Sequence, residues 1–513
     1  MDGVVTDTAQ AHAAAWKRLF DEFLRARSEA LGEAFVPFDA RTEYRRYVDG
    51  KPRYDGVESF LRARGIELAR GDVGDEPGDE TVCALGNRKD RYFNDWLDRH
   101  AVRTYPGALA LIRAVRAAHK RTALFSSSRN AHRVLQVAGV LDLFDARVDG
   151  VDLVQLGLAG KPDPAMLLEA AARVGVTPRR AAVFEDAVAG VRAGTRGGFG
   201  LVVGVSREGL VGAQADALRE AGANVVVAAL SEVRCEANGL SVKTLDALPG
   251  VSDSRELIEQ RFREAELAIF LDYDGTLTPI VEDHTRAFLS DAMRETLRRL
   301  AQCHLVAVIS GRDLPQLREL VGLEEIYYAG SHGFDLAGPG GWHARLGEGE
   351  RFLEDLDAAE RDLREGIAGI EGHSLERKTF DIAVHYRRVP ASRVAEVEPV
   401  VDRVLKLHPR LRKGRGKKVF EIRPDVDWDK GRAVRWLLAH LGLDRPGVVP
   451  VYIGDDLTDE DAFRELAGAG LAVAVRDGAR DGARNTSADF GLDDPQDVRA
   501  FLEFLSGSGG RRR

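Results

Sequence analysis

Cysteine is scarce in this 513-residue chain, which contains only three. Cys83, Cys235 and Cys303 lie far apart and have neither zinc-site nor redox-pair spacing, so we expect reduced thiols. Long apolar runs are also lacking. No stretch approaches the ~20 residues that a membrane helix needs, and the first residues lack a secretory signal pattern. These absences predict a cytoplasmic protein without a membrane-spanning segment.

The chain has no excess of positive charge. Its formal net charge is -9, from 73 lysines and arginines against 82 aspartates and glutamates. A nucleic-acid partner would require a basic surface, so this balance argues against one, whereas a small anionic substrate held by local cations is compatible with it. The length predicts roughly two to four globular domains. The sequence does not specify an oligomeric state.

What the chain does contain is an apolar strand that runs directly into two carboxylates. Ala268-Ile269-Phe270-Leu271 precedes Asp272-Tyr273-Asp274-Gly275. Side chains two residues apart in an extended segment point the same way, so Asp272 and Asp274 can reach one ligand at the strand end. One carboxylate can attack phosphorus while the other transfers the proton of the leaving oxygen. The alternative is a plain acidic turn after a buried strand.

Two later clusters in the same half suit a phosphate group. The strand-like run Leu305–Ile309 ends in Ser310-Gly311-Arg312, where a hydroxyl and a guanidinium can bind phosphate oxygens. Lys430 opens a helical stretch and offers a cation. Alone, the first cluster would indicate a turn and the second a solvated surface lysine.

An acidic cluster follows the strand-like run Val451–Gly454. Asp455 and Asp456 come first, followed by Asp459-Glu460-Asp461. Carboxylates this crowded repel one another unless a cation compensates them, which favours a Mg²⁺ site. A solvated acidic helix start would explain Asp459 to Asp461 but not Asp455 and Asp456.

In this order the motifs resemble those of the haloacid-dehalogenase-like phosphotransferases. With Gly330-Ser331-His332-Gly333, Glu376-Arg377-Lys378 and Phe420-Glu421-Ile422, residues 267–505 more specifically resemble trehalose-6-phosphate phosphatase. The resemblance implies a Rossmann-like α/β domain with an α/β cap and Mg²⁺ as cofactor. It also implies hydrolysis of trehalose 6-phosphate through an aspartyl-phosphate, a step of trehalose biosynthesis. Phosphatases for sucrose phosphate or mannosyl-glycerate phosphate are the alternatives.

The same resemblance implies a role for individual residues. The implied catalytic residues are Asp272 (nucleophile), Asp274 (acid and base), Ser310 and Lys430. The implied Mg²⁺ ligands are Asp272, the Asp274 backbone carbonyl and Asp455, with Asp456 in support. The implied sugar-binding residues are Arg312, His332, Glu376, Lys378 and Glu421. Without the resemblance, Glu376 and Lys378 would be a surface pair beside a strand.

The first half repeats part of this pattern. Met1-Asp2-Gly3 aligns with the end of the D-x-D motif, and three later clusters suit phosphate and Mg²⁺. With His12, Trp16 and the segment Asp49–Gly56, residues 1 to about 232 resemble β-phosphoglucomutase, which implies a second haloacid-dehalogenase fold with a helical cap. The implied site residues are Asp2, Ser126, Lys161, Glu185 and Asp186.

This first half has no counterpart of Asp272, because Asp2 aligns with Asp274 and the strand before it is missing. Either the natural protein begins before Met1 and supplies both, or the domain is a noncatalytic scaffold or regulatory module. We favour the first interpretation, since losing a central strand exposes hydrogen-bonding edges with no benefit to the fold. A phosphatase using Asp2 alone is the weakest interpretation.

These observations together predict tandem domains. The expected ranges are 1–234 for the first domain with its cap at about 13–100, 235–262 for a linker and connecting helix, 263–507 for the second domain with its cap at about 335–425, and 508–513 for a disordered tail.

Overall fold

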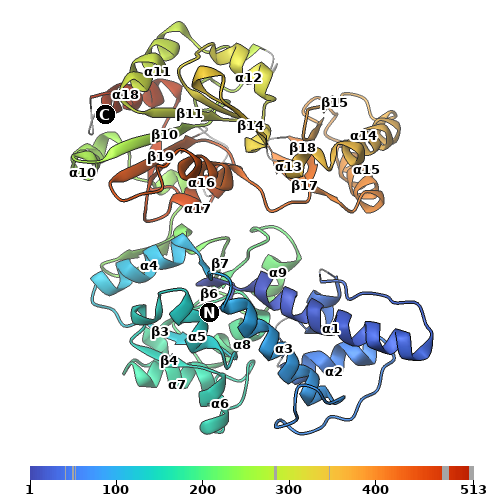
Figure 1. Cartoon of the computed structure of the whole chain (residues 1–513). Helices are drawn as coiled ribbons and strands as arrows, with labels where there is room; N and C mark the ends of the chain where they lie inside the picture. The colour runs from blue at the N-terminus through green and yellow to red at the C-terminus, as the bar shows by residue number, and fades with distance from the viewer. Residues whose placement is uncertain are drawn as a thin grey trace. The chain divides into compact units, whose positions relative to one another are not determined.

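The structure is a computed structural model that describes residues 1–40, 42–48, 51, 53–281, 286–345, 347–416, 418–476 and 484–507. The chain divides into two compact units, Met1–Ser241 and Val242–Arg513 (Figure 1). Each contains parallel strands and helices, so the prediction of two tandem α/β domains is confirmed. The expected tail at 508–513, and Asp49, Gly50 and Pro52 of the first cap, lie outside the described residues.

The second unit is built on an eight-stranded sheet. Its spatial order is β14-β13-β12-β11-β10-β19-β20-β21, with β10 parallel to both of its neighbours. In chain order the strands are β10 (Glu266–Leu271), β11 (Leu305–Ile309), β12 (Tyr327–Gly330), β13 (Asp335–Ala337), β14 (His343–Arg345), β19 (Val448–Gly454), β20 (Leu471–Val475) and β21 (Phe490–Leu492). The central position of β10 places the residue after it at the middle of the carboxyl edge.

Both faces of this sheet are covered. Ile269 and Leu271 of β10 belong to one buried cluster, while Ala268 and Phe270 belong to another, as the two-residue period of a strand requires. Figure 1 shows α11, α12 and α18 on one face and α16 and α17 on the other. The helices are α10 (Arg255–Phe262), α11 (Asp291–Cys303), α12 (Leu314–Val321), α16 (Lys430–His440), α17 (Glu460–Leu466) and α18 (Pro495–Leu505).

A four-stranded antiparallel sheet forms the cap of this unit, in the order β15-β16-β18-β17. Its elements are α13 (Gly347–Glu350), α14 (Leu353–Ile367), β15 (Ser374–Arg377), β16 (Ile382–His385), α15 (Val394–Leu407), β17 (Leu411–Gly416) and β18 (Val419–Pro424). Helices α14 and α15 bury their apolar sides against this sheet. The predicted cap start near residue 335 is wrong, because β13 and β14 fold back antiparallel on β12 and extend the core sheet.

The first unit has smaller sheets. Its parallel strands form two separate groups, β3-β4 and β5-β6-β7, while β1 pairs antiparallel with β2. The strands are β1 (Thr6–Asp7), β2 (Arg103–Thr104), β3 (Ala123–Phe125), β4 (Ala146–Val148), β5 (Ala182–Glu185), β6 (Leu201–Val205) and β7 (Val225–Val227). Among the described residues no strand lies between β3 and β5, where β10 stands between β11 and β19 in the second unit.

Helices complete the first unit. They are α1 (Ala9–Leu31), α2 (Arg53–Ala63), α3 (Val82–Leu97), α4 (Pro106–Ala117), α5 (Ala131–Val137), α6 (Gly150–Gln155), α7 (Ala165–Arg173), α8 (Val188–Arg196) and α9 (Ala213–Glu220). Helices α1 to α3 pack around an aromatic core that includes Phe20, Phe38 and Phe60. This cluster gives the helical cap a hydrophobic core of its own.

The boundary between the units falls inside the range predicted for the linker and connecting helix, 235–262, and α10 lies at the end of that range. A hairpin, β8 (Val233–Glu236) and β9 (Gly239–Val242), spans the division between Ser241 and Val242, and the chain after it packs within the second unit. Lys243 Nζ donates to the carbonyl of Ala488 at 2.9 Å, and Ile258 and Phe262 of α10 are buried in the second core. In the part of the chain that the structure describes, no helix is both long and apolar enough to span a membrane.

Candidate active site

Asp272 lies at the carboxyl edge of the second sheet, directly after the central strand β10, and is only 5% exposed. The backbone then turns sharply at Gly275, whose φ is +89°. A Cβ at this position would come within 2.3 Å of Asp455 Oδ2. Only glycine therefore lets the loop after β10 approach the loop after β19 this closely.

A buried ion network surrounds Asp272. Lys430, the first residue of α16, places its Nζ 2.6 Å from Asp272 Oδ1 and 2.6 Å from Asp459 Oδ1. The preceding Asp429 caps the helix by accepting a hydrogen bond from the Arg432 amide. This cap fixes the helix start and thereby the direction of the lysine.

Asp459 is completely buried and accepts four hydrogen bonds. Its Oδ1 accepts from Lys430 and from the Tyr452 hydroxyl at 2.7 Å, and its Oδ2 accepts from the amides of Asp455 and Asp456 at 3.0 and 2.9 Å. The sequence interpretation of Asp459 as part of a solvated helix start is therefore wrong. Its carboxylate instead holds the lysine and shapes the loop that carries Asp455.

The donor set fits a hard divalent cation. One carboxylate oxygen from each of Asp272, Asp455 and Asp459 lies within 4.8 Å of the others. Because four donors already bond to Asp459, Asp272 and Asp455 are the members of this group better placed to offer oxygens to such a cation. Burial raises the pKa of Asp272 well above its usual value, with Asp459 and Asp455 adding to the shift that Lys430 opposes. Three carboxylates facing one ammonium leave an excess of negative charge that Mg²⁺ would neutralise.

Asp456 lies in the same loop but is only half-buried. Its Oδ1 accepts a hydrogen bond from the amide of Leu457 at 2.7 Å, so the side chain shapes the turn. This contact is compatible with the supporting role that was predicted for Asp456.

The loop after β11 holds the second carboxylate of the motif. Arg312 donates from Nε and Nη2 to the two carboxylate oxygens of Asp274, both at 2.6 Å. Ser310 is 2% exposed, and its Oγ accepts from the Arg312 amide at 3.2 Å. In this arrangement Arg312 orients Asp274, a role that the prediction of sugar binding did not include.

Lys378 reaches from the cap to this loop. Its Nζ donates to the carbonyl of Gly311 at 3.0 Å and lies 3.5 Å from Asp381 Oδ1. Burial acts to lower the pKa of Lys378, but Asp381 and Glu421 raise it above its usual value. Lys378, whose side chain is 13% exposed, is thus a largely buried cation that faces the phosphate loop, Ser310–Asp313, and the interpretation as a surface pair is wrong for it.

The remaining predicted sugar-binding residues also lie in unit two. Glu421 contacts Arg423 and lies 3.6 Å from His332, whereas Glu376 Oε2 lies 3.2 Å from His385 Nε2. Burial lowers the pKa of His332 to about 4, with Arg423 adding to the shift, so its imidazole is neutral near pH 7. Ser331 and His332 have φ of 48° and 56°, a strained pair of the kind found where a side chain must be aimed.

In the first unit, some of the predicted site residues lie close together. Lys161 Nζ lies 3.2 Å from Glu185 Oε2, and a Cβ at Gly3 would lie 1.7 Å from Asp186 Oδ2, so the Asp2-Gly3 turn sits against Asp186. Burial raises the pKa of Asp186 to about 7, with Glu185 adding to the shift. Ser126 is buried, and its Oγ accepts from the Ser128 amide.

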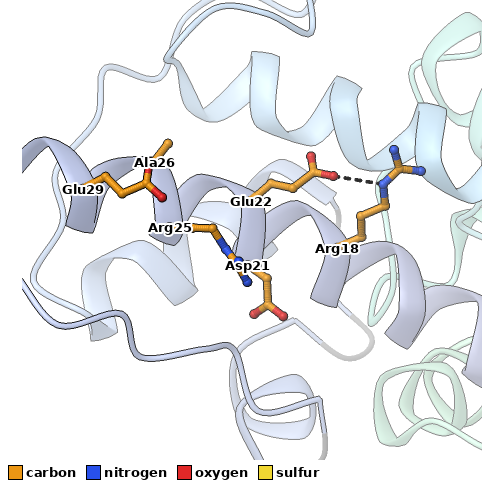
Figure 2. Close-up of a pocket in the computed structure, with 6 residues that line it drawn as sticks. All are labelled: Arg18, Asp21, Glu22, Arg25, Ala26 and Glu29. Carbon is orange, nitrogen blue, oxygen red and sulfur yellow. Dashed lines mark hydrogen bonds and ion pairs between the residues drawn. The ribbon is translucent and has the colours of Figure 1, made fainter.

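The cavity drawn in Figure 2 is a separate feature of helix α1. Arg18 and Glu22 line it and form an ion pair at 3.0 Å. It contains none of the predicted site residues.

Comparisons with known proteins match a family profile to each of the two units. Residues 270–496 match the profile of the trehalose-phosphatase family, and residues 1–198 match that of haloacid dehalogenase-like hydrolases. A trehalose-phosphate phosphatase from Mycobacterium marinum is 39% identical over 387 residues, covering 75% of this chain and 95% of that protein. The chain belongs to the trehalose-phosphatase family.

Two further relatives differ in the share of their own length that this member of the trehalose-phosphatase family covers. A trehalose-phosphate phosphatase from Mycobacterium tuberculosis is 41% identical over 339 residues, covering 66% of this chain and 84% of that protein. A protein of the same organism named an uncharacterized glycosyl hydrolase is 38% identical over 510 residues, 99% of this chain. The chain spans only 37% of that relative's length.

Both predicted resemblances are confirmed at the family level, the first half as a haloacid dehalogenase-like hydrolase domain. In the trehalose-phosphatase unit the structure adds Asp459, Tyr452 and Asp381 to the predicted site. The spacing of four residues between Asp455 and Asp459 is the sequence feature that could have indicated Asp459. Nothing in the local sequence distinguishes Tyr452 or Asp381.

Proposed function

We propose that the second unit hydrolyses trehalose 6-phosphate to trehalose and phosphate. The observation that carries this proposal is the buried group of Asp272, Lys430 and Asp459 beside Asp455, in a chain of the trehalose-phosphatase family. The reaction would be a step of trehalose biosynthesis, and we place it in the cytoplasm because sugar phosphates are handled there.

Asp272 is the proposed nucleophile. Its carboxylate oxygen bonds to phosphorus while the bond from phosphorus to the sugar oxygen breaks, which leaves an aspartyl-phosphate. Asp274 enters the cycle protonated on one oxygen, which then no longer accepts from Arg312, and donates this proton to the departing sugar oxygen. It then takes a proton from the water that attacks the aspartyl-phosphate, which restores its starting form. Lys430 neutralises negative charge on the phosphoryl oxygens and on Asp272.

Mg²⁺ is the proposed cofactor, held by the carboxylates of Asp272 and Asp455 and by the Asp274 backbone carbonyl, with Asp456 in support. When bound, it supplies positive charge to the phosphoryl group. Asp459 contributes by fixing Lys430 and the amides of Asp455 and Asp456. Ser310 offers its hydroxyl to a phosphoryl oxygen.

The cap residues Glu376, Lys378 and Glu421, with His332, are the proposed sugar contacts. They combine two carboxylates, an ammonium and a neutral imidazole, which pair with hydroxyl groups as donors or acceptors. Such a set rejects a sugar that lacks a required hydroxyl better than apolar contacts do. A phosphatase for sucrose phosphate or mannosyl-glycerate phosphate is the alternative.

For the first unit we propose either a β-phosphoglucomutase that needs a carboxylate from outside residues 1–241, or a noncatalytic partner of the phosphatase. The division of the parallel strands into two sheets, β3-β4 and β5-β6-β7, is compatible with both. An in-frame sequence upstream of Met1 that encodes an apolar strand ending in aspartate would favour the mutase, and its absence would favour the partner.

The deciding experiment measures phosphate release from trehalose 6-phosphate, sucrose 6-phosphate and glucose 6-phosphate, with Mg²⁺ and with EDTA. Asp272→Asn is compared with wild type and with Asp444→Asn, which removes a charge from an exposed loop of the same unit. We expect Mg²⁺-dependent turnover of the trehalose ester, lost in Asp272→Asn and retained in Asp444→Asn. Turnover of another ester alone would refute the sugar assignment, and full activity of Asp272→Asn would refute the mechanism.

A further inference from the structure

Asp313 joins the core of the second unit to its cap. Its Oδ1 accepts a hydrogen bond from Ser331 Oγ in the core at 2.9 Å. Both carboxylate oxygens accept from the amide of Thr379 in the cap, at 3.0 and 3.1 Å. One side chain therefore binds a backbone group of the cap and a side chain of the core at the same time.

Asp313 occupies the N-cap position of α12. It precedes the first residue of α12, where an aspartate ordinarily accepts hydrogen bonds from the first helical turn, but its carboxylate accepts none from that turn. The Asp313 side chain bonds to the Thr379 amide instead of capping α12. The local preference has been overridden by a tertiary contact between cap and core.

The neighbours of Asp313 and Thr379 belong to the proposed site. Lys378 precedes Thr379 and donates to the carbonyl of Gly311, while Arg312 precedes Asp313 and holds Asp274. The loop Ser310–Asp313 is thus bonded to two consecutive cap residues and to the proposed acid and base. A displacement of Thr379 would move Lys378 away from the phosphate loop.

We propose that Asp313 is a positioning residue that docks the end of β15 on the phosphate loop, so that Glu376 and Lys378 face a sugar phosphate bound at Asp272. The inference rests on the proposed function of this unit. Hydrolysis of a sugar phosphate depends on this docking. Hydrolysis of a small aryl phosphate, which lacks the sugar, does not.

The test compares Asp313→Ala with wild type in the full chain, using trehalose 6-phosphate and p-nitrophenyl phosphate as substrates. Glu319→Ala, on the exposed side of α12, is the matched control for loss of an acidic side chain. We expect the KM for the sugar ester to rise about tenfold or more in Asp313→Ala, as for the loss of a charge-assisted hydrogen bond, and kcat/KM for the aryl ester to change less than about twofold. Asp313→Asn keeps an acceptor oxygen and should recover part of the lost affinity.

Amide hydrogen exchange without substrate supplies a second measurement. Asp313→Ala should speed exchange in peptides that span β15 and β16 and leave those from β10 and β19 unchanged, which also shows that the core is folded. Equal losses on both esters, or an unchanged sugar KM together with unchanged exchange, would overturn the positioning role. A wild-type chain that cleaves only the aryl ester would instead refute the proposed function, while the exchange experiment would still decide whether Asp313 docks the cap.

Discussion

Replacing Asp381 by asparagine should make the second unit more stable at neutral and alkaline pH. Asp381 is 1% exposed, and neither of its carboxylate oxygens has a hydrogen-bond partner among the described residues. Lys378 lies 3.5 Å away, Arg423 adds a favourable charge, and Glu421 and Asp313 add unfavourable ones. The charged form of Asp381 is therefore poorly solvated in the folded protein.

The magnitude follows from the pKa of this carboxyl. Burial raises the pKa of Asp381 from 3.8 to about 6 in the folded state. A rise in pKa from 3.8 to about 6 corresponds to about 3 kcal/mol of unfolding free energy. Between about pH 4 and pH 6 the folded state binds more protons than the unfolded state, so stability falls as the pH rises through this window. Above pH 6 the full penalty is present, and asparagine, which stays neutral, avoids it.

The assay is unfolding in urea at pH 8 and at pH 4, followed by pulsed amide exchange in peptides from β16 and β18. These strands adjoin Asp381 and report on the cap itself. We expect Asp381→Asn to gain up to about 3 kcal/mol at pH 8 and almost nothing at pH 4. Asp444→Asn, which removes an exposed charge, should change neither value.

Two results would refute the reasoning. A loss of stability at pH 8 would mean that the attraction to Lys378 outweighs the desolvation of the carboxylate. An equal gain at both pH values would mean that the effect does not arise from ionisation of Asp381.

The other predictions concern the ion network at Asp272. Lys430→Met leaves two buried carboxylates without their cation, so it should lower the unfolding free energy by about 3–5 kcal/mol at pH 8 in urea titrations, and unchanged stability would contradict the network. Asp459→Asn should lower phosphate release at least about tenfold, because Lys430 and the Asp455 loop lose their common anchor. Tyr452→Phe removes only one of the four hydrogen bonds to Asp459 and should cost about 1 kcal/mol of stability with a smaller effect on kcat. A Tyr452→Phe variant as inactive as Asp459→Asn would show that the hydroxyl has a larger role.

The order of the motifs could be predicted from sequence because it depends on local patterns. A short apolar run such as Ala268–Leu271, followed closely by Gly275, favours a strand, and the residues that follow parallel strands meet at one edge of the sheet. Asp272, Ser310, Lys430 and Asp455 could therefore be assigned to one site before their distances were known. The family resemblance added the sugar and the cap residues, which no spacing indicates.

Tertiary structure alone decided how these side chains pair and which acidic residues are buried. Asp459 looked like a solvated helix start, yet it is completely buried against Lys430, which lies 29 residues away in the chain. Arg312 turned toward Asp274, and Asp313 toward Thr379, 66 residues later. Local sequence fixes the direction of a strand or helix, but the burial of a charge and its choice of partner depend on packing between segments that are distant in the chain.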